Sequence, residues 1–81
     1  GLMPKLPQIS GRQMGRVLVR LGFRFKSQKG SHIKFVRERH EDEEEEVIII
    51  PNHRVLRKGT LHDILKKVDV RATGDLKKLM K

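Results

Sequence analysis

Four histidines are the side chains of this sequence best suited to proton transfer near neutral pH, and the chain has no cysteine. His32 is the first candidate, because it follows a Gly30-Ser31 turn and has Lys29 and Lys34 close to it in sequence. A histidine can take the proton of an RNA 2′-hydroxyl or give one to the leaving oxygen, and a nearby cation stabilises the phosphorane-like charge. On these residues alone, an ordinary surface histidine is the favoured interpretation, and a catalytic role for His32 in RNA cleavage is the alternative.

A second histidine is expected at the same end of the predicted sheet. If Arg39 opposes Val47 in an antiparallel hairpin, His32 faces a position about 54, give or take two, which includes His53. His53 is then either a second acid/base group or a phosphate-binding group. The other interpretation is that it caps the turn by hydrogen bonding to the backbone.

The sequence argues against several other kinds of site. His40 and His62 have the pattern of surface residues, and four histidines at these spacings without a cysteine do not make a zinc site. The chain has no Walker loop, no dinucleotide-binding glycine pattern and no nucleophile elbow. We therefore expect no metal and no cofactor.

Charge points to a polyanionic partner. Lysine and arginine total 19 against 10 acidic residues, for a net charge of +9, and six of the acidic residues lie in the run 41–46. A basic domain of this size is typical of nucleic-acid binding, and a generally soluble surface is the alternative. The acidic turn, 40–46, is either a solvated turn or a phosphate mimic that moderates binding. The residues expected to bind RNA are Arg24, Lys26, Lys29, Gly30, Ser31, Lys34, Arg57, Lys58 and Thr60.

Helices are expected at both ends of the chain. Ser10 and Gln13 form a capping box, an apolar stripe follows at helical spacing, and Gly22 supplies a left-handed stop, so a helix is predicted over 11–21. A second helix is expected to begin at Gly59-Thr60, with Thr60 as an ordinary cap. The alternative interpretation is that the free N–H groups at this helix start bind a phosphate. Thr73 is expected to cap a short last helix.

Three strands are expected between these helices. They are Phe23–Lys26, His32 to about Arg39 and Val47–Ile50, with Pro51 ending the third. The fold class is therefore α+β, α-β-β-β-α(-α), a three-stranded antiparallel sheet with helices packed on one face. The apolar third strand indicates either a partner surface or a well-covered core. The residues expected to be buried are Val17, Leu18, Leu21, Phe23, Phe25, Ile33, Phe35, Ile64 and Leu65.

Length and composition predict a single domain, 1–81, with an extended N-terminal segment at 1–9. No apolar run approaches the roughly 20 residues of a membrane span, and no secretory leader pattern is visible. Together with the absence of cysteine, this favours a cytoplasmic protein and no membrane partner.

The same residues resemble the HicA toxin family, also called the YcfA-like family. The matching motifs are the two segments Pro4-Lys5-Leu6-Pro7 and Ser10-Gly11, then Leu21-Gly22-Phe23, Gln28-Lys29-Gly30-Ser31-His32, Pro51-Asn52-His53, and Lys58-Gly59-Thr60-Leu61 running into Ile64-Leu65-Lys66. The resemblance implies a double-stranded-RNA-binding-domain-like fold, a metal-independent endoribonuclease that cleaves mRNA with His32 as catalytic histidine, and a HicB-type antitoxin as partner.

One departure from the family pattern concerns the acidic run, which replaces a shorter, glycine-containing turn. It puts the path of RNA across the sheet in doubt and leaves room for a member that binds RNA poorly or has lost toxicity. The alternative function is accordingly a non-catalytic RNA-binding module of the same fold, in which His32 is a contact residue. A DNA-binding or ribosome-associated scaffold is a third interpretation.

Overall fold

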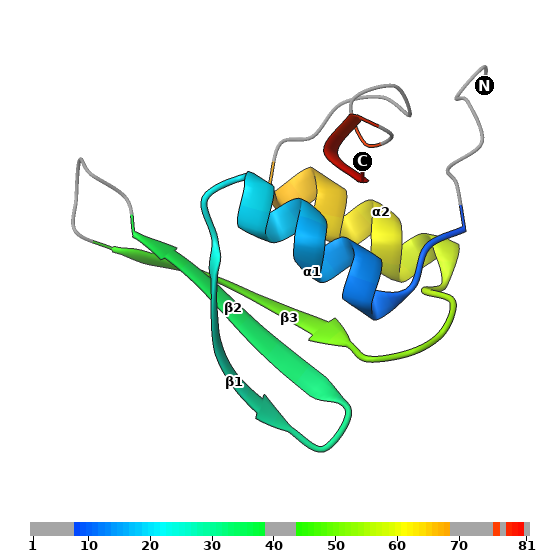
Figure 1. Cartoon of the computed structure of the whole chain (residues 1–81), viewed down its shortest axis with the longest axis horizontal. Helices are drawn as coiled ribbons and strands as arrows, with labels where there is room; N and C mark the ends of the chain where they lie inside the picture. The colour runs from blue at the N-terminus through cyan, green and yellow to red at the C-terminus, as the bar shows by residue number, and fades with distance from the viewer. Residues whose placement is uncertain (1–7, 39–43, 69–75, 77, 81) are drawn as a thin grey trace.

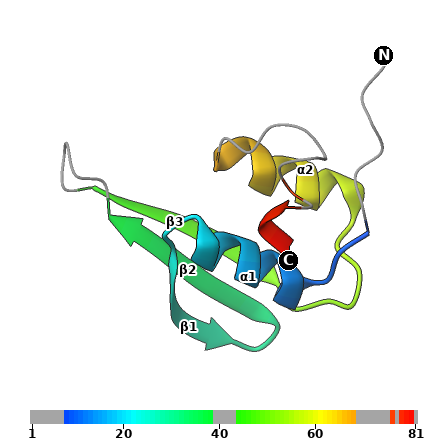
Figure 2. The same cartoon turned by 45° about the horizontal axis from the view of Figure 1, so that its top comes forward.

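The computed structural model describes residues 8–38, 44–68, 76 and 78–80. The elements follow in the order α1 (Gly11–Arg20), β1 (Arg24–Lys29), β2 (His32–Glu38), β3 (Glu45–Pro51) and α2 (Lys58–Lys67). The sheet is antiparallel with the strand order β1-β2-β3, and both helices cover one of its faces (Figure 1). The view in Figure 2 shows the same two layers. This α+β arrangement, consistent with the double-stranded-RNA-binding-domain-like fold, is the one that the sequence predicts.

The segments at the two ends of the chain add to the core. Ile9 is buried, and Leu76 is buried with residues 78–80 helical next to it. Thr73, the expected cap of that last helix, lies outside the described residues, as do residues 1–7 and His40. Within the described part of the chain, no helix is both long and apolar enough to cross a bilayer.

The ends of α1 confirm their sequence signals. The Ser10 hydroxyl accepts the Gln13 N–H at 3.1 Å, and the Gln13 side chain accepts the Ser10 N–H at 2.8 Å, so the capping box is complete. Gly22 has φ +97°, the left-handed conformation that favours glycine. The helix ends at Arg20, one residue earlier than expected.

Two glycines let α1 approach the sheet closely. A Cβ at Gly11 would collide with the Pro51 carbonyl oxygen, and a Cβ at Gly15 would lie 2.9 Å from the Phe35 ring. The N–H of Gly11 also donates to the His53 carbonyl at 2.9 Å, which ties the start of the helix to the segment after β3. The glycines therefore fix how the helix layer sits on the end of the sheet that carries both candidate histidines.

This contact predicts a large difference between two glycine-to-alanine substitutions. Gly11→Ala should lower the free energy of unfolding by about 2–3 kcal/mol, because the added methyl overpacks against backbone that cannot move freely. Gly59 lies in α2 with nothing near its missing Cβ, so Gly59→Ala should raise stability by about 0.5–1 kcal/mol. Urea unfolding of both variants checks the pair, and equal effects would contradict the close approach of α1.

The register of the β2–β3 hairpin differs from the expected one. His32 pairs with Pro51 and Glu38 with Glu45, so β3 is shifted by three residues and Glu45 and Glu46 belong to the strand, not to the turn. Basic partners explain the shift. The Glu46 carboxylate accepts from the Arg37 guanidinium at 2.8 Å, and Glu45 contacts Arg24 and Lys26. The expected third strand is defined by its apolar residues, so Glu45 and Glu46, which ion pairs stabilise in the strand, are left out of it.

Arg37 joins three elements at the far end of α1. Besides pairing with Glu46, its guanidinium donates to the Leu21 carbonyl at 2.7 Å and lies 4.4 Å from the centroid of the Phe23 ring. A cation at the C-terminal end of a helix is favourable because the helix dipole is negative there. These contacts hold the segment between α1 and β1 in place and so position the first strand.

The core confirms most of the expected residues, with one clear error. Phe25 is 56% exposed, although the sequence predicts it to be buried, and Leu21 is only partly buried. Phe25 does lie on the helix side of the sheet, with its ring edge-to-face against Phe35 at 6.2 Å. It stays exposed because β1 is an edge strand with a bulge between Phe25 and Ser27, and because α1 presents glycine at that level. The confirmed residues are Val17, Leu18, Phe23, Ile33, Phe35, Ile64 and Leu65.

The start of α2 also differs from the prediction. The helix begins at Lys58 after an extended Arg57, so Thr60 is the third helical residue and not the cap. Leu56 explains the earlier start, because it is buried and its N–H donates to the Ile9 carbonyl at 2.8 Å. This contact holds the backbone in place at Leu56, the residue before Arg57. The Arg57 carbonyl then accepts the N–H of buried Leu61 at 2.9 Å, which is the first hydrogen bond of the helix.

Candidate nucleic-acid interface

One end of the molecule brings together the segments that carry both candidate histidines. His32 begins β2 and pairs with Pro51, and the Asn52 N–H donates to the Ser31 carbonyl at 2.6 Å. His53 is the next residue, and its carbonyl receives the N–H of Gly11. The Gly30–Ser31 turn, the segment 52–57 and the starts of both helices therefore meet at this histidine end of the fold (Figure 1).

The His32 side chain is available to a ligand. It is exposed, and it belongs to the sheet face opposite the helices, because its neighbour Ile33 is buried against them. Lys29 pairs directly with His32, and Lys34 lies two residues further along the same face. Among the described residues, neither His32 nor His53 has a side-chain hydrogen bond or ion pair. An exposed histidine flanked by two lysines can exchange protons beside a phosphate.

The turn before His32 is open. Gly30 has φ +58°, and no atom lies within 4 Å of the position that its Cβ would occupy. A ligand can therefore approach the backbone of Gly30 on the side where a side chain would otherwise stand. The sequence predicts a turn at this place, and the structure differs only in that Lys29 belongs to β1 and not to the turn.

The starts of both helices add positive potential to the histidine end. Each helix carries about half a positive charge at its N-terminus, and both N-termini lie here (Figure 1). No side chain caps α2, so the interpretation of its start as an ordinary capped helix is wrong. Arg57, Lys58 and Thr60, three of the expected RNA-binding residues, lie at this start.

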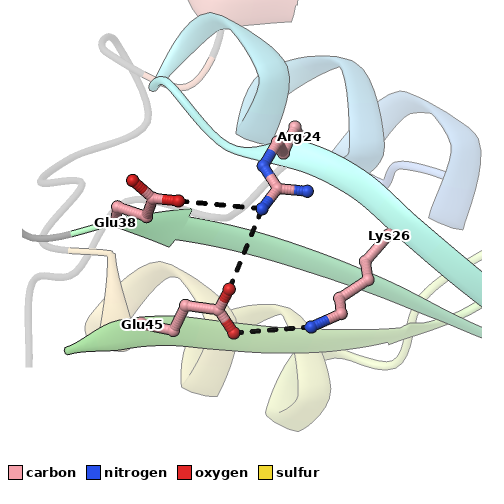
Figure 3. Close-up of polar contacts among 4 residues, drawn as sticks. All are labelled: Arg24, Lys26, Glu38 and Glu45. Carbon is pink, nitrogen blue, oxygen red and sulfur yellow. Dashed lines mark ion pairs between the residues drawn. The ribbon is translucent and has the colours of Figure 1, made fainter. Parts of the chain in front are cut away.

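Two other expected RNA-binding residues are held by carboxylates. Arg24 Nη2 lies 3.9 Å from Glu38 and 3.8 Å from Glu45, and Lys26 Nζ lies 3.6 Å from Glu45 (Figure 3). This cluster lies at the other end of the sheet, since Glu38 follows His32 by six strand residues, or about 20 Å. The sequence predicts Arg24 and Lys26 among the RNA-binding cations. Their pairing with carboxylates is not predicted, because Glu45 is expected in the turn.

Neutralising Glu45 should therefore strengthen RNA binding. Glu45→Gln removes a carboxylate that contacts both Arg24 and Lys26, and we expect RNA affinity to rise about threefold to tenfold at low salt. Stability should change by less than about 1 kcal/mol, because exposed ion pairs contribute little. Asp63→Asn, an exposed acidic residue on α2, is the control for net charge, and fluorescence anisotropy measures both. An equal gain in the two variants would mean that only net charge matters.

A groove between α1 and β1 was not predicted at all. It is open to solvent, has a volume of about 500 Å³ and is lined by Arg12, Arg16 and Arg20 of α1, with Phe25 and Gln28 of β1 opposite. The arginines recur at every fourth residue, a spacing that places them on one helix face. That spacing is visible in the sequence, but the assignment of Phe25 to the core concealed it.

Comparison with known families settles the class of protein. The family model described as HicA toxin of bacterial toxin-antitoxin matches residues 11–70, which run from the first residue of α1 to beyond the end of α2. The chain belongs to the HicA toxin family. A HicA toxin is the toxin of a toxin–antitoxin system, so pairing with an antitoxin follows. Neither the curated proteins nor the solved structures give a match.

The segment that matches the HicA family model contains the candidate residues of the histidine end. The matched segment includes Lys29, the Gly30–Ser31 turn, His32, His53 and the start of α2. It also includes Glu45 and Glu46, the acidic residues of β3. No group of three or more metal-ligating side chains occurs within the part of the chain that the structure describes.

Proposed function

We propose that this HicA toxin is a metal-independent endoribonuclease that cleaves mRNA, with His32 as the catalytic residue. The observation that carries the proposal is an exposed histidine that pairs with Lys29 and directly follows an open glycine turn. These features supply the proton-transfer group, the positive charge and the access to backbone that phosphodiester cleavage needs.

In the proposed reaction, the 2′-oxygen of one nucleotide attacks the adjacent phosphorus, and the bond from phosphorus to the 5′-oxygen breaks. A base takes the proton of the 2′-hydroxyl, and an acid gives a proton to the leaving 5′-oxygen. The products are a 2′,3′-cyclic phosphate and a 5′-hydroxyl. His32 performs one of these transfers, and Lys29 and Lys34 stabilise the charge on the phosphorus oxygens.

His53 is proposed as the second group, either as the other acid/base or as a phosphate-binding group. Its support is its place in the chain, two residues after Pro51, which pairs with His32. Arg57, Lys58 and Thr60 are proposed to hold a neighbouring phosphate at the uncapped start of α2.

The test uses a labelled RNA and the same oligonucleotide with 2′-deoxy nucleotides. Purified toxin should cut the RNA in the presence of EDTA and leave cyclic phosphate ends, and it should not cut the deoxy substrate. Loss of activity in EDTA contradicts a metal-independent mechanism, and cleavage of the deoxy substrate contradicts attack by the 2′-oxygen.

A non-catalytic RNA-binding module is the second candidate. It is favoured by the exposed position of His32 beside Lys29, which suits a contact with phosphate even when no proton is transferred. This function predicts that wild-type protein binds RNA without cutting it at any pH.

The antitoxin is proposed to be of the HicB type and to cover the sheet face that carries His32. Val47 and Ile49 expose 42% and 54% of their surface on this face. A protein partner that covers His32 would bury these two side chains as well. Of the two interpretations of the third strand, the well-covered core holds for Ile48 and Ile50, which are buried under the helices. The partner surface stays a proposal for Val47 and Ile49.

A further inference from the structure

The groove between α1 and β1 has the composition of a binding site for a nucleotide. Its walls are three arginines on one side and the exposed edge strand on the other, and its volume of about 500 Å³ falls within the range of small-ligand pockets. No acidic side chain lines it. A ligand that matches this lining has a negatively charged group for the arginines and a flat apolar group for Phe25.

The groove exists because of residues that the fold requires. Gly11 and Gly15 place no side chain between α1 and the sheet, so the floor is formed by Ile33 and Phe35. Phe25 rises from the edge strand, 56% exposed, and its ring is braced edge-to-face against Phe35. An exposed aromatic ring held in place by a second ring is a preformed stacking surface.

The arginines suit a chain of phosphates. Arg12, Arg16 and Arg20 follow one another at every fourth residue, so their Cα atoms rise by about 6 Å at each step along the helix. This rise is comparable to the separation of consecutive phosphates in an extended single strand. Among the described residues, Arg12 and Arg16 have no ion pair, and Arg20 donates only to the Lys78 carbonyl at 3.3 Å.

The groove leads to the histidine end. Gln28 lines it and donates to the Gly30 carbonyl at 3.1 Å, and Gly11 lines it beside Pro51 and Asn52. A strand that leaves the groove here passes the open turn before His32. The groove thus lies next to the proposed cleavage site, on the other side of the β1–β2 hairpin.

We propose that this groove binds an unpaired nucleotide of the RNA substrate, with its base stacked on Phe25 and its phosphates on Arg12 and Arg16. The inference rests on the proposed function and deepens it, because it makes a single strand, not a duplex, the substrate. Every base can stack on an aromatic ring, so we expect the groove to distinguish unpaired RNA from duplex RNA and to show little preference for base sequence.

The test is made in the His32→Ala background, so that RNA is bound without being cut. Phe25→Leu keeps an apolar side chain and loses the ring, and it should weaken binding of a short labelled single-stranded RNA about tenfold. Phe25→Trp should retain or improve the affinity. Binding of a blunt RNA duplex should be the same for all three proteins.

The charge of the groove is tested in parallel. Arg16→Ala should reduce the slope of log affinity against log salt by about 0.7 for single-stranded RNA, whereas Lys66→Ala, an exposed cation on α2, should not change it. Circular dichroism melting confirms that each variant is folded. A gain-of-affinity result for Phe25→Trp would be strong support, because a merely structural effect does not produce it.

The outcomes separate this inference from the proposed function. If wild-type and His32→Ala proteins bind RNA and Phe25→Leu changes nothing, the groove is not a nucleotide site, while the proposed function stands. If Phe25→Leu weakens only the complex with the antitoxin, the groove is a protein-binding site and the inference is overturned. If the His32→Ala protein binds no RNA at all, the proposed function fails together with the inference.

Discussion

His32→Ala should abolish RNA cleavage while leaving the fold and RNA binding nearly intact. General acid–base groups contribute about 10²–10⁴-fold to rate, so their removal leaves little detectable activity. The side chain is exposed and makes no cavity when removed, so stability should change by less than about 1 kcal/mol. Cleavage of a labelled RNA in EDTA, followed from pH 5 to 9, measures the loss.

His53→Ala is the informative comparison for this experiment. It should reduce the rate less than His32→Ala, and it should alter the pH–rate profile if the two histidines share the proton transfers. His62→Ala, an exposed histidine on α2, is the matched control and should behave as wild type. Full activity in the His32 variant would remove the catalytic assignment of that residue. Binding without cleavage by the wild-type protein would favour the RNA-binding module.

The fold could be predicted because its local signals agree with one another. The capping box at Ser10, the glycine stop at Gly22 and the alternation around Ile33 each define an element without reference to the rest of the chain. The position of His32 follows from the same alternation. A residue that starts a strand after a tight turn is placed by local geometry, which a single sequence contains.

The errors arise where a distant contact decides the outcome. The β2–β3 register depends on ion pairs of Glu45 and Glu46 with residues far from them in sequence, and the start of α2 depends on Leu56 meeting Ile9. The exposure of Phe25 depends on a bulge and on a glycine of another element. None of these partners is implied by periodicity, so the carboxylate cluster and the arginine groove emerge only from the tertiary structure.

RNA affinity should fall steeply with salt, and the slope should report which cations touch phosphate. Lys29, Lys34, Arg57 and Lys58 lie at the histidine end or on its sheet face, and none has an ion pair among the described residues. Four phosphate contacts to a single strand give a slope of log affinity against log salt of about −3, or a loss of roughly 50-fold between 50 and 200 mM. Fluorescence anisotropy over that range measures the slope.

The value of the slope distinguishes two surfaces. If Arg12 and Arg16 of the groove contact phosphate as well, the slope should approach about −4 for single-stranded RNA and stay near −3 in the Arg12→Ala, Arg16→Ala double variant. Lys29→Ala should make the salt dependence less steep in either background, because Lys29 pairs with His32 and so lies beside the proposed cleavage site. A flat salt dependence in the wild-type protein would mean that its positive charge serves only solubility, since binding through phosphates must release counterions.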